Sequence, residues 1–356
     1  MADIKVMVVD DSLLTRKVLS DIIKNTEGLV LAGTANDGKY ALAKIPFLKP
    51  DVITMDVNMP KMDGITTLQE IMSRFPTPVI MVSAVTREAA AETIAALEAG
   101  AVDFVTKPET DSEIEEIQQI IVSKIKSAAG VKIDNVKTKT PPDRKKESIK
   151  FIDAPQSPVD TSKPFAKKII AIGISTGGPK ALKEVFENRI LDPDISILIV
   201  QHMPDTFTGA FASRLNQMSN LTVKEAEDND PILEGHVYIA PGHSHIVVKR
   251  KNGNPYIALD RRGKVSGHMP SADVLFLSVA EQFGSKSVGV IMTGMGRDGA
   301  DGLKELSNKG AFTIAQNEAT SVVFGMNREA ILLGAAKKVV SLYEITDVMS
   351  DAYKRL

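Results

Sequence analysis

The sequence predicts an α/β protein of two domains, each built on a mostly parallel sheet covered by helices. Short apolar runs alternate with segments whose apolar residues recur at helical spacing, an alternation typical of parallel sheets. The chain has 356 residues, more than one hydrophobic core usually serves. A proline-rich, charged stretch interrupts the alternation near the middle, so the pattern itself falls into two parts.

Residues 1–127 form the first predicted domain. Between its first two strands, Leu14, Val18 and Ile22 repeat at the spacing of one helix face. Helices that connect parallel strands cross over the sheet, which predicts helices on both of its faces. Five apolar runs predict the strands themselves, at residues 4–9, 30–33, 52–55, 79–82 and 101–105.

Residues 128–165 predict an extended linker. They show little periodicity and contain the charged run 143–147 together with Pro141, Pro142, Pro155, Pro158 and Pro164. Strand-like runs then resume at residues 169–173, 195–201, 237–240, 246–249 and 288–292, with helical segments between most of them. We therefore expect a second α/β domain over residues 166–356.

The composition is that of a soluble protein and excludes several functions. The formal net charge of −2 gives no general attraction to nucleic acid or anionic membranes. No cysteine is present, which excludes disulfides, thiolate zinc sites and cysteine nucleophiles. The apolar runs are far shorter than the ~20 residues of a membrane-spanning helix, and the first residues lack a signal-peptide core. We expect a cytoplasmic protein that neither inserts into membranes nor binds nucleic acid.

Carboxylates follow two strands of the first domain, at the edge where parallel sheets bind ligands. Asp10 and Asp11 follow the first strand, and Asp56 follows the third. Carboxylates brought together repel one another, and Mg²⁺ relieves that repulsion while it can also bridge to phosphate oxygens. Ser83 and Lys107 follow the fourth and fifth strands, where a hydroxyl and an ammonium could hold a phosphoryl group. Each of these residues alone is more often a turn or cap residue, but five together favour a site.

In the sequence around these residues, the first domain resembles the receiver domain of two-component response regulators. The matching segments are Val8-Val9-Asp10-Asp11-Ser12, residues 55–64, Val82-Ser83-Ala84 and Thr106-Lys107-Pro108. The resemblance implies a flavodoxin-like (βα)5 fold in which a histidine kinase phosphorylates Asp56. It also implies that Asp10, Asp11, Asp56 and the carbonyl of Asn58 hold Mg²⁺, and that Ser83 and Lys107 sense the phosphoryl group. Phe104, rather than tyrosine, occupies the position of the switching aromatic residue.

The segment Gly173-Ile174-Ser175-Thr176-Gly177 follows an apolar run directly and has the pattern G-x-S-x-G. A serine on a sharp turn between a buried strand and a helix is exposed, so that a base and backbone N–H donors can reach its hydroxyl. Two other interpretations remain. The segment is also compatible with a turn in which Ser175 caps the helix, and with a phosphate-binding loop. The phosphate loop would lack both the dinucleotide fingerprint and the Walker lysine.

A serine nucleophile needs a base, and all five histidines lie in the second half. His202 ends the run 195–201, so it too follows a strand, whereas His243 and His245 lie in a turn as loop residues or substrate contacts. Asp298 follows the strand 288–292, either to orient the imidazole or to cap a helix. The ends of three strands can converge, which predicts a Ser175–His202–Asp298 triad in a chain order unlike that of the α/β-hydrolases.

From residue 169 the chain resembles the catalytic domain of the chemotaxis protein-glutamate methylesterases, the CheB family. The matching segments are residues 171–179, 201–204, 237–242, 270–276, 292–299 and 321–326. The resemblance implies a mostly parallel sheet with Rossmann-like winding, and an oxyanion hole formed with the Met295 region. It implies substrates too: glutamate γ-methyl esters, and glutamines for deamidation, on methylated cytoplasmic helices of chemoreceptors. The sequence differs from the residues typical of the family at Asn327 and in the stretch Gln316-Asn317-Glu318.

A receiver joined to a hydrolase suggests a switch in which phosphorylation of Asp56 opens access to the active site. The competing interpretation is a phosphorylation-controlled binding module whose second domain performs no chemistry. Catalysis predicts many turnovers that depend on His202, whereas binding predicts saturation at a fixed stoichiometry.

Overall fold

The computed structural model describes residues 2–107, 111–131, 133, 162–187 and 189–356. The chain divides into two compact units, Met1–Ile149 and Lys150–Leu356. Most of the predicted linker, including Pro141, Pro142, Pro155 and Pro158, lies outside the described residues.

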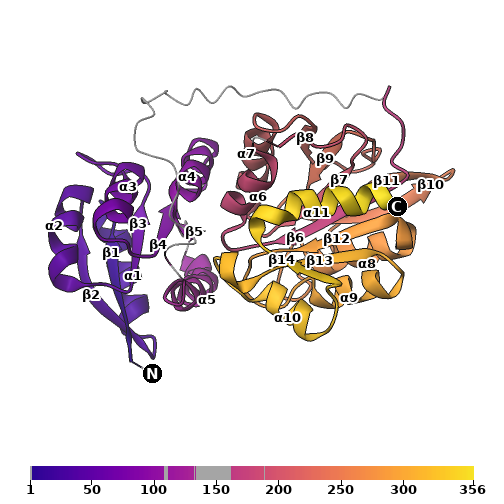
Figure 1. Cartoon of the computed structure of the whole chain (residues 1–356). Coiled ribbons are helices and arrows are strands. Elements are labelled where there is room, and N and C mark those ends of the chain that lie inside the picture. The colour runs from indigo at the N-terminus through magenta and orange to yellow at the C-terminus, as the bar shows by residue number, and fades with distance from the viewer. Residues whose placement is uncertain (1, 108–110, 132, 134–161, 188) are drawn as a thin grey trace. The chain divides into compact units, whose positions relative to one another are not determined.

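The first unit is a five-stranded parallel sheet in the order β2-β1-β3-β4-β5 (Figure 1). Helices α1 and α5 pack together, and α2, α3 and α4 pack in a second layer. All five strands overlap the predicted ones. The strands are β1 (Ile4–Val9), β2 (Leu29–Ala35), β3 (Val52–Asp56), β4 (Val79–Ser83) and β5 (Asp103–Thr106). The helices are α1 (Leu13–Lys24), α2 (Gly38–Leu48), α3 (Gly64–Arg74), α4 (Arg87–Ala99) and α5 (Asp111–Ala128).

The central strands of this unit form because their side chains are buried on both faces. Every residue of β3 and of β4 is buried, which explains why each appears as a continuous apolar run. Polar caps fix where the helices begin; the Ser12 hydroxyl, for example, accepts the N–H of Thr15 at the start of α1. Strand order reverses between β1 and β3, so the residues that follow these two strands border the crevice where such sheets bind ligands.

The second unit is a seven-stranded parallel sheet in the order β14-β13-β12-β6-β7-β9-β8. Helices α6, α7 and α11 pack in one layer, and α8, α9 and α10 in another (Figure 1). Its strands are β6 (Ile169–Ile174), β7 (Ile197–Gln201), β8 (Thr222–Glu225), β9 (His236–Ile239), β12 (Ser287–Ile291), β13 (Phe312–Gln316) and β14 (Lys338–Val340). Its helices are α6 (Gly178–Phe186), α7 (Asp205–Asn216), α8 (Ala272–Gln282), α9 (Ala300–Asn308), α10 (Met326–Leu332) and α11 (Leu342–Arg355).

One predicted strand of this unit lies outside the main sheet. Residues 246–249 belong to β10 (His245–Lys251), which pairs with β11 (Asn254–Asp260) in a separate antiparallel sheet. In the main sheet, Ile174 pairs with Gln201, and Gly173 pairs with Ile291. The carboxyl ends of β6, β7 and β12 are therefore level, and the residues that follow them meet at one edge.

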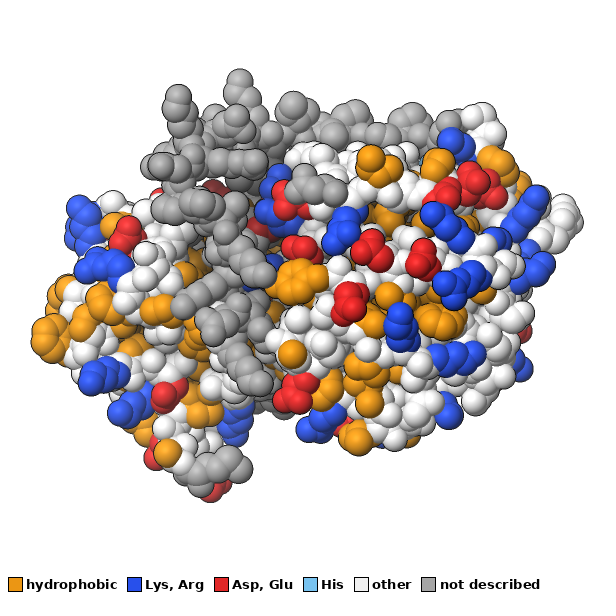
Figure 2. All heavy atoms as spheres, in the orientation of Figure 1, with side chains coloured by type: hydrophobic (Ala, Val, Ile, Leu, Met, Phe, Trp, Pro, Cys, Tyr) orange, Lys and Arg blue, Asp and Glu red, His pale blue; other side chains and the backbone are white. Residues whose placement is uncertain are grey.

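The core of the second unit is formed by large side chains between the sheet and its helices. Tyr238, Phe186, Phe207, Phe211 and Phe276 are among the largest fully buried residues. On the face shown in Figure 2, acidic and basic side chains of this unit are interspersed. None of the described helices combines the length and the apolar character needed to cross a membrane.

Candidate functional site

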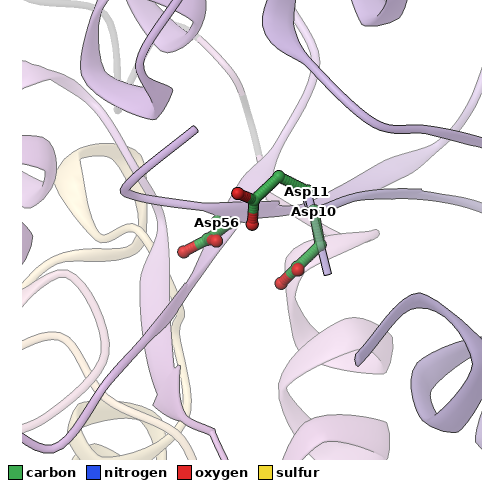
Figure 3. A group of neighbouring side chains, drawn as sticks. All are labelled: Asp10, Asp11 and Asp56. Atoms are coloured by element: carbon green, nitrogen blue, oxygen red, sulfur yellow. The ribbon is translucent and has the colours of Figure 1, made fainter. Parts of the chain in front are cut away.

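The three predicted carboxylates of the first unit lie together (Figure 3). Carboxylate oxygens of Asp10, Asp11 and Asp56 are all within 4.8 Å of one another. Asp10 and Asp56 are buried, and Asp11 is exposed. The ammonium of Lys107 lies 2.7 Å from Oδ2 of Asp56 and 3.0 Å from Oδ2 of Asp10. Four of the five residues predicted from strand ends thus form one cluster.

The electrostatics of this cluster suit a divalent cation. Burial raises the pKa of Asp10 and of Asp56, and the neighbouring Lys107 only partly offsets that effect. Burial opposes the charge of Lys107 as well, but the two carboxylates outweigh it and raise the pKa of Lys107. Oδ2 of Asp10 is buried and, apart from the Lys107 ion pair, has no hydrogen-bond partner among the described residues. An all-oxygen donor set with an unsatisfied buried oxygen fits Mg²⁺.

Ser83 and Asn58 border this cluster. Ser83 is buried at the end of β4, directly after Val82, which pairs with Asp56 across the sheet. Its hydroxyl accepts a hydrogen bond of 2.7 Å from the Thr93 hydroxyl. Asn58 is exposed in the loop after β3, and its N–H lies 3.3 Å from Oδ1 of Asp56. Strand pairing thus brings Ser83 to the edge that holds Asp56, and the loop after β3 places Asn58 there.

Phe104, the residue that the resemblance places at the position of the switching aromatic, is packed inside the first unit. It lies in β5 with 4% of its surface exposed. The ammonium of Lys124 lies 5.4 Å from the centre of its ring.

In the second unit, Ser175 stands on a sharp turn between β6 and α6. Its N–H donates to the carbonyl of Thr293 (3.0 Å), and its own carbonyl accepts from the Gln201 amide (3.1 Å) and the N–H of Gly178 (2.8 Å). The turn needs glycine at Gly177, whose φ is 78°. The half-buried Ser175 is thus held through its backbone from both neighbouring strands, as in a nucleophile elbow.

His202 directly follows β7 and is held by Asp298. Nε2 of its ring lies 2.7 Å from Oδ2 of Asp298. Because an ionised carboxylate only accepts, Nε2 carries the proton, and the lone pair of the neutral ring is on Nδ1. Nδ1 is buried and has no hydrogen-bond partner among the described residues. It is therefore the ring atom available to take a proton from a nucleophile.

The side chain of Asp298 lies against the N-terminus of α8, a helix that comes earlier in the chain. Its Oδ1 accepts from the Ser271 hydroxyl (2.6 Å) and the N–H of Asp273 (3.2 Å), and Oδ2 accepts from the N–H of Ala272 (2.7 Å). Burial alone would raise the pKa of Asp298, but the bond to His202 and these donors outweigh it and lower that pKa to about 2. Asp298 is thus a carboxylate at neutral pH, the form that orients an imidazole.

Two of the other histidines have structural positions. His245 is fully buried; its Nδ1 accepts the N–H of Ser271 (3.0 Å), and its Nε2 lies 2.7 Å from the carbonyl of Gly263. His236 is buried in β9, and its Nδ1 lies 2.9 Å from the carbonyl of Glu234. Because His245 accepts the N–H of Ser271, it supports the segment that holds Asp298.

Two residues beside the predicted triad had no predicted role. His268 stacks on the ring of His202, with the ring centres 3.8 Å apart. Ser271 caps α8 and also donates to Asp298. A serine before an apolar helical segment is a cap signal, which could have located the start of α8. The sequence held no signal for the contact with Asp298.

The turn after β12 packs tightly against Ser175. We therefore predict that Gly294→Ala impairs both the stability of the protein and any reaction at Ser175. A Cβ at Gly294 would lie 2.3 Å from Sδ of Met326 and 2.8 Å from Cβ of Ser175. Such overpacking costs about 1–3 kcal/mol of stability and displaces the serine. We expect kcat of any reaction at Ser175 to fall about 100-fold, the typical effect of a 1 Å displacement.

Gly289→Ala is the matched control, because its Cβ would crowd Leu306 (2.6 Å) and Leu303 (2.7 Å) within β12, away from Ser175. Urea unfolding should show similar destabilisation of both variants, with kcat lost only in Gly294→Ala. Equal kcat in the two would show that the packing of this turn does not position Ser175.

Comparison with known proteins agrees with both halves of the chain. Residues 6–119 match the family model of the response regulator receiver domain, and residues 170–349 match that of the CheB methylesterase. A protein-glutamate methylesterase/protein-glutamine glutaminase of Pyrococcus horikoshii is 44% identical over 351 residues, which cover 98% of this chain and 93% of that protein. A protein of the same name from Sulfurimonas denitrificans is 45% identical over 348 residues, or 96% of each.

The solved structure of the Thermotoga maritima CheB methylesterase catalytic domain covers 52% of this chain and 97% of its own, with a TM-score of 0.50 and 41% identity. These similarities confirm the resemblance predicted from the sequence. The chain belongs to the CheB family, the protein-glutamate methylesterases/protein-glutamine glutaminases with an N-terminal receiver domain.

Proposed function

We propose that this protein is a chemotaxis response regulator that hydrolyses glutamate γ-methyl esters on the cytoplasmic helices of chemoreceptors, and that it also deamidates glutamines there. Its place of action is then the cytoplasm. The observation that carries the proposal is the His202–Asp298 pair, which leaves Nδ1 of His202 without a partner beside the strand end that bears Ser175. The names of the similar proteins support the same chemistry.

In the first half of the reaction, Ser175 becomes acylated. Its Oγ bonds to the ester carbonyl carbon while its proton moves to Nδ1 of His202, and Asp298 stays ionised beside the resulting imidazolium. The carbon–oxygen bond to the methoxy group then breaks, and the proton on Nδ1 leaves with methanol. For a glutamine, ammonia leaves in the same way.

In the second half, water repeats these steps. It gives a proton to Nδ1 and bonds to the acyl carbon, after which the bond to Oγ breaks and Ser175 takes the proton back. The product is a glutamate side chain.

The negative charge of the tetrahedral intermediate needs donors close to Ser175. The Met295 backbone is our candidate, because it follows Gly294, whose Cα faces the Ser175 side chain. One such donor is typically worth about 2.7–4 kcal/mol in the transition state.

In the receiver, Asp56 is the proposed phosphoryl acceptor and a chemotaxis histidine kinase the proposed donor. Asp10, Asp11, Asp56 and the carbonyl of Asn58 would hold Mg²⁺, which when bound neutralises the carboxylates and a phosphoryl oxygen. Lys107, already 2.7 Å from Asp56, would hold a second phosphoryl oxygen. Ser83, at the neighbouring strand end, would bind a third.

We predict that Asp56→Ala abolishes phosphate incorporation from a small phosphodonor, because the substitution removes the proposed acceptor carboxylate, whose Oδ2 lies 2.7 Å from the ammonium of Lys107. Incorporation is measured with labelled acetyl phosphate in the presence of Mg²⁺. A chelator should reduce incorporation by the unchanged protein to background as well. Asp51→Ala is the control, since Asp51 is an exposed residue just before β3, at the opposite end of this strand from Asp56, and its carboxylate accepts the N–H of Lys5. Incorporation that persists in Asp56→Ala would refute the assignment.

A binding module without chemistry is the competing function, and a turnover count separates the two. Receptor membranes that carry labelled methyl esters are mixed with a tenfold deficit of phosphodonor-treated protein. The esterase releases many equivalents of methanol per protein, and His202→Ala stops the release. A binding module releases none and saturates the receptors at a fixed stoichiometry.

A further inference from the structure

The ring of His268 covers one face of the His202 ring. The two ring centres are 3.8 Å apart and the planes differ by 7°. His268 lies in the connection between β11 and α8, in a tight loop closed by two backbone hydrogen bonds of 2.9 Å between Val265 and His268. This loop comes from none of the three strands that carry Ser175, His202 and Asp298.

The same connection also holds Asp298, the hydrogen-bond partner of His202. Three residues after His268, the Ser271 hydroxyl donates to Oδ1 of Asp298, and the next N–H, that of Ala272, donates to Oδ2. His245 fixes this point from the other side by accepting the N–H of Ser271. One short segment, residues 265–272, therefore contacts both the base and its orienting carboxylate.

The face contact supplies a constraint that the hydrogen bond alone does not. The bond from Nε2 to Asp298 fixes one atom of the imidazole, and the ring can still rotate about that contact. Nδ1, the atom that must meet the Ser175 hydroxyl, has no hydrogen-bond partner among the described residues. A ring stacked at 3.8 Å restricts this rotation.

We infer that His268 is a positioning residue for the hydrolysis reaction, acting through the face of its ring to keep Nδ1 of His202 in line with Ser175. The inference rests on the proposed function, in which His202 is the base.

The test compares His268→Ala with His268→Phe in the full-length, phosphodonor-treated protein. Phenylalanine keeps a flat ring but no ring nitrogen, whereas alanine removes the stack. Two rates are measured: kcat and KM for methanol release from receptor membranes, and the labelling of Ser175 by a small fluorophosphonate. In the labelling, Oγ displaces fluoride from phosphorus, so the rate reports the nucleophile without receptor binding.

We expect His268→Ala to lower kcat and the labelling rate about 10- to 100-fold at unchanged KM, the range that a small misplacement of a catalytic group produces. His268→Phe should recover both rates to within about threefold of the unchanged protein. Tyr343→Ala is the control, because it also removes an aromatic ring, but a partly exposed one in α11 that has no role in the proposed reaction. Thermal melting shows whether each variant is folded.

Three results would overturn the inference: unchanged labelling in His268→Ala, a raised KM as the sole defect, or a folded His268→Phe as slow as His268→Ala. The last would assign the effect to a ring nitrogen. Failure of the proposed function has a different signature, since the unchanged protein would then release no methanol whatever stands at position 268.

Discussion

Replacing Ser175 with alanine is expected to reduce methanol release from methyl-esterified receptors by about 10⁵- to 10⁶-fold, the usual effect of removing a triad serine. In the proposed mechanism, the hydroxyl that this substitution removes is the group that bonds to the acyl carbon. The variant should fold normally, because the hydrogen bonds that hold Ser175 to Thr293, Gly178 and Gln201 all involve its backbone.

The matched control is Ser285→Ala, an exposed serine just before β12, at the opposite edge of the sheet. It should keep full activity. Initial rates of methanol release, with thermal melting of each variant, check the prediction. A Ser175→Ala protein that retains even 1% of the rate would exclude Ser175 as the nucleophile.

Asp298→Asn is expected to have the second-largest effect, a fall in kcat of about 10³- to 10⁴-fold. Oδ2 of Asp298 accepts from both His202 and the N–H of Ala272, so an amide nitrogen there would face two donors. His202 can relieve this conflict by moving its proton to Nδ1, but it then has no lone pair for the Ser175 proton. Turning the amide over instead places its nitrogen against the N–H of Asp273.

Ser271→Ala is the control for this change, because it removes one donor to Asp298 and leaves the tautomer of His202 intact. Its kcat should fall less than about tenfold, with a stability loss of about 1 kcal/mol for the lost helix cap. Similar kcat values for the two variants would contradict a role of Asp298 in setting the tautomer.

The low pKa of Asp298 also gives the pH dependence of its contribution to stability. The folded pKa of about 2 is below the ordinary 3.8, so ionised Asp298 stabilises the fold fully above pH 3.8, and the contribution is lost as the pH falls through 2. The difference in unfolding free energy between the unchanged protein and Asp298→Asn should therefore decrease as the pH falls from about 4 towards 2.

The sequence predicted most of the strands that are buried on both faces, but not β13, whose last four residues are buried. The strands β3, β4, β6 and β12, and β1 from Val6 onward, appear as mostly apolar runs because the sheets are parallel and covered by helices. The candidate site residues that follow such strands could be brought together by the same reasoning, since the carboxyl ends of parallel strands meet at one edge.

Elements with little burial or with a different pairing were harder to predict. The edge strand β14 contains the exposed residues Lys338 and Val339, so it lacks an apolar run. The strand β8 is also an edge strand, with only two buried residues. The hairpin of β10 and β11 had a usable signal in Asn252-Gly253, both with positive φ, which is typical of a two-residue turn.

The surroundings of the triad could not be predicted, because they depend on contacts between distant segments. His268 meets His202 across 66 positions of the sequence (268 − 202), and Ser271 meets Asp298 across 27. Neither pair leaves a periodic pattern in the sequence. The sequence shows where the histidines stand in the chain, but not which of them are in contact in the fold.

The most direct test of a phosphorylation-controlled esterase is the initial rate of methanol release from methyl-esterified receptor membranes, measured with Mg²⁺ in the presence and absence of acetyl phosphate. We predict that the phosphodonor raises the rate of the unchanged protein at least about tenfold, which corresponds to ~1.4 kcal/mol between the two states. It should leave Asp56→Ala at its basal rate, and Ser175→Ala should show no release under either condition. Equal stimulation of Asp56→Ala and the unchanged protein, or release by Ser175→Ala, would contradict the account.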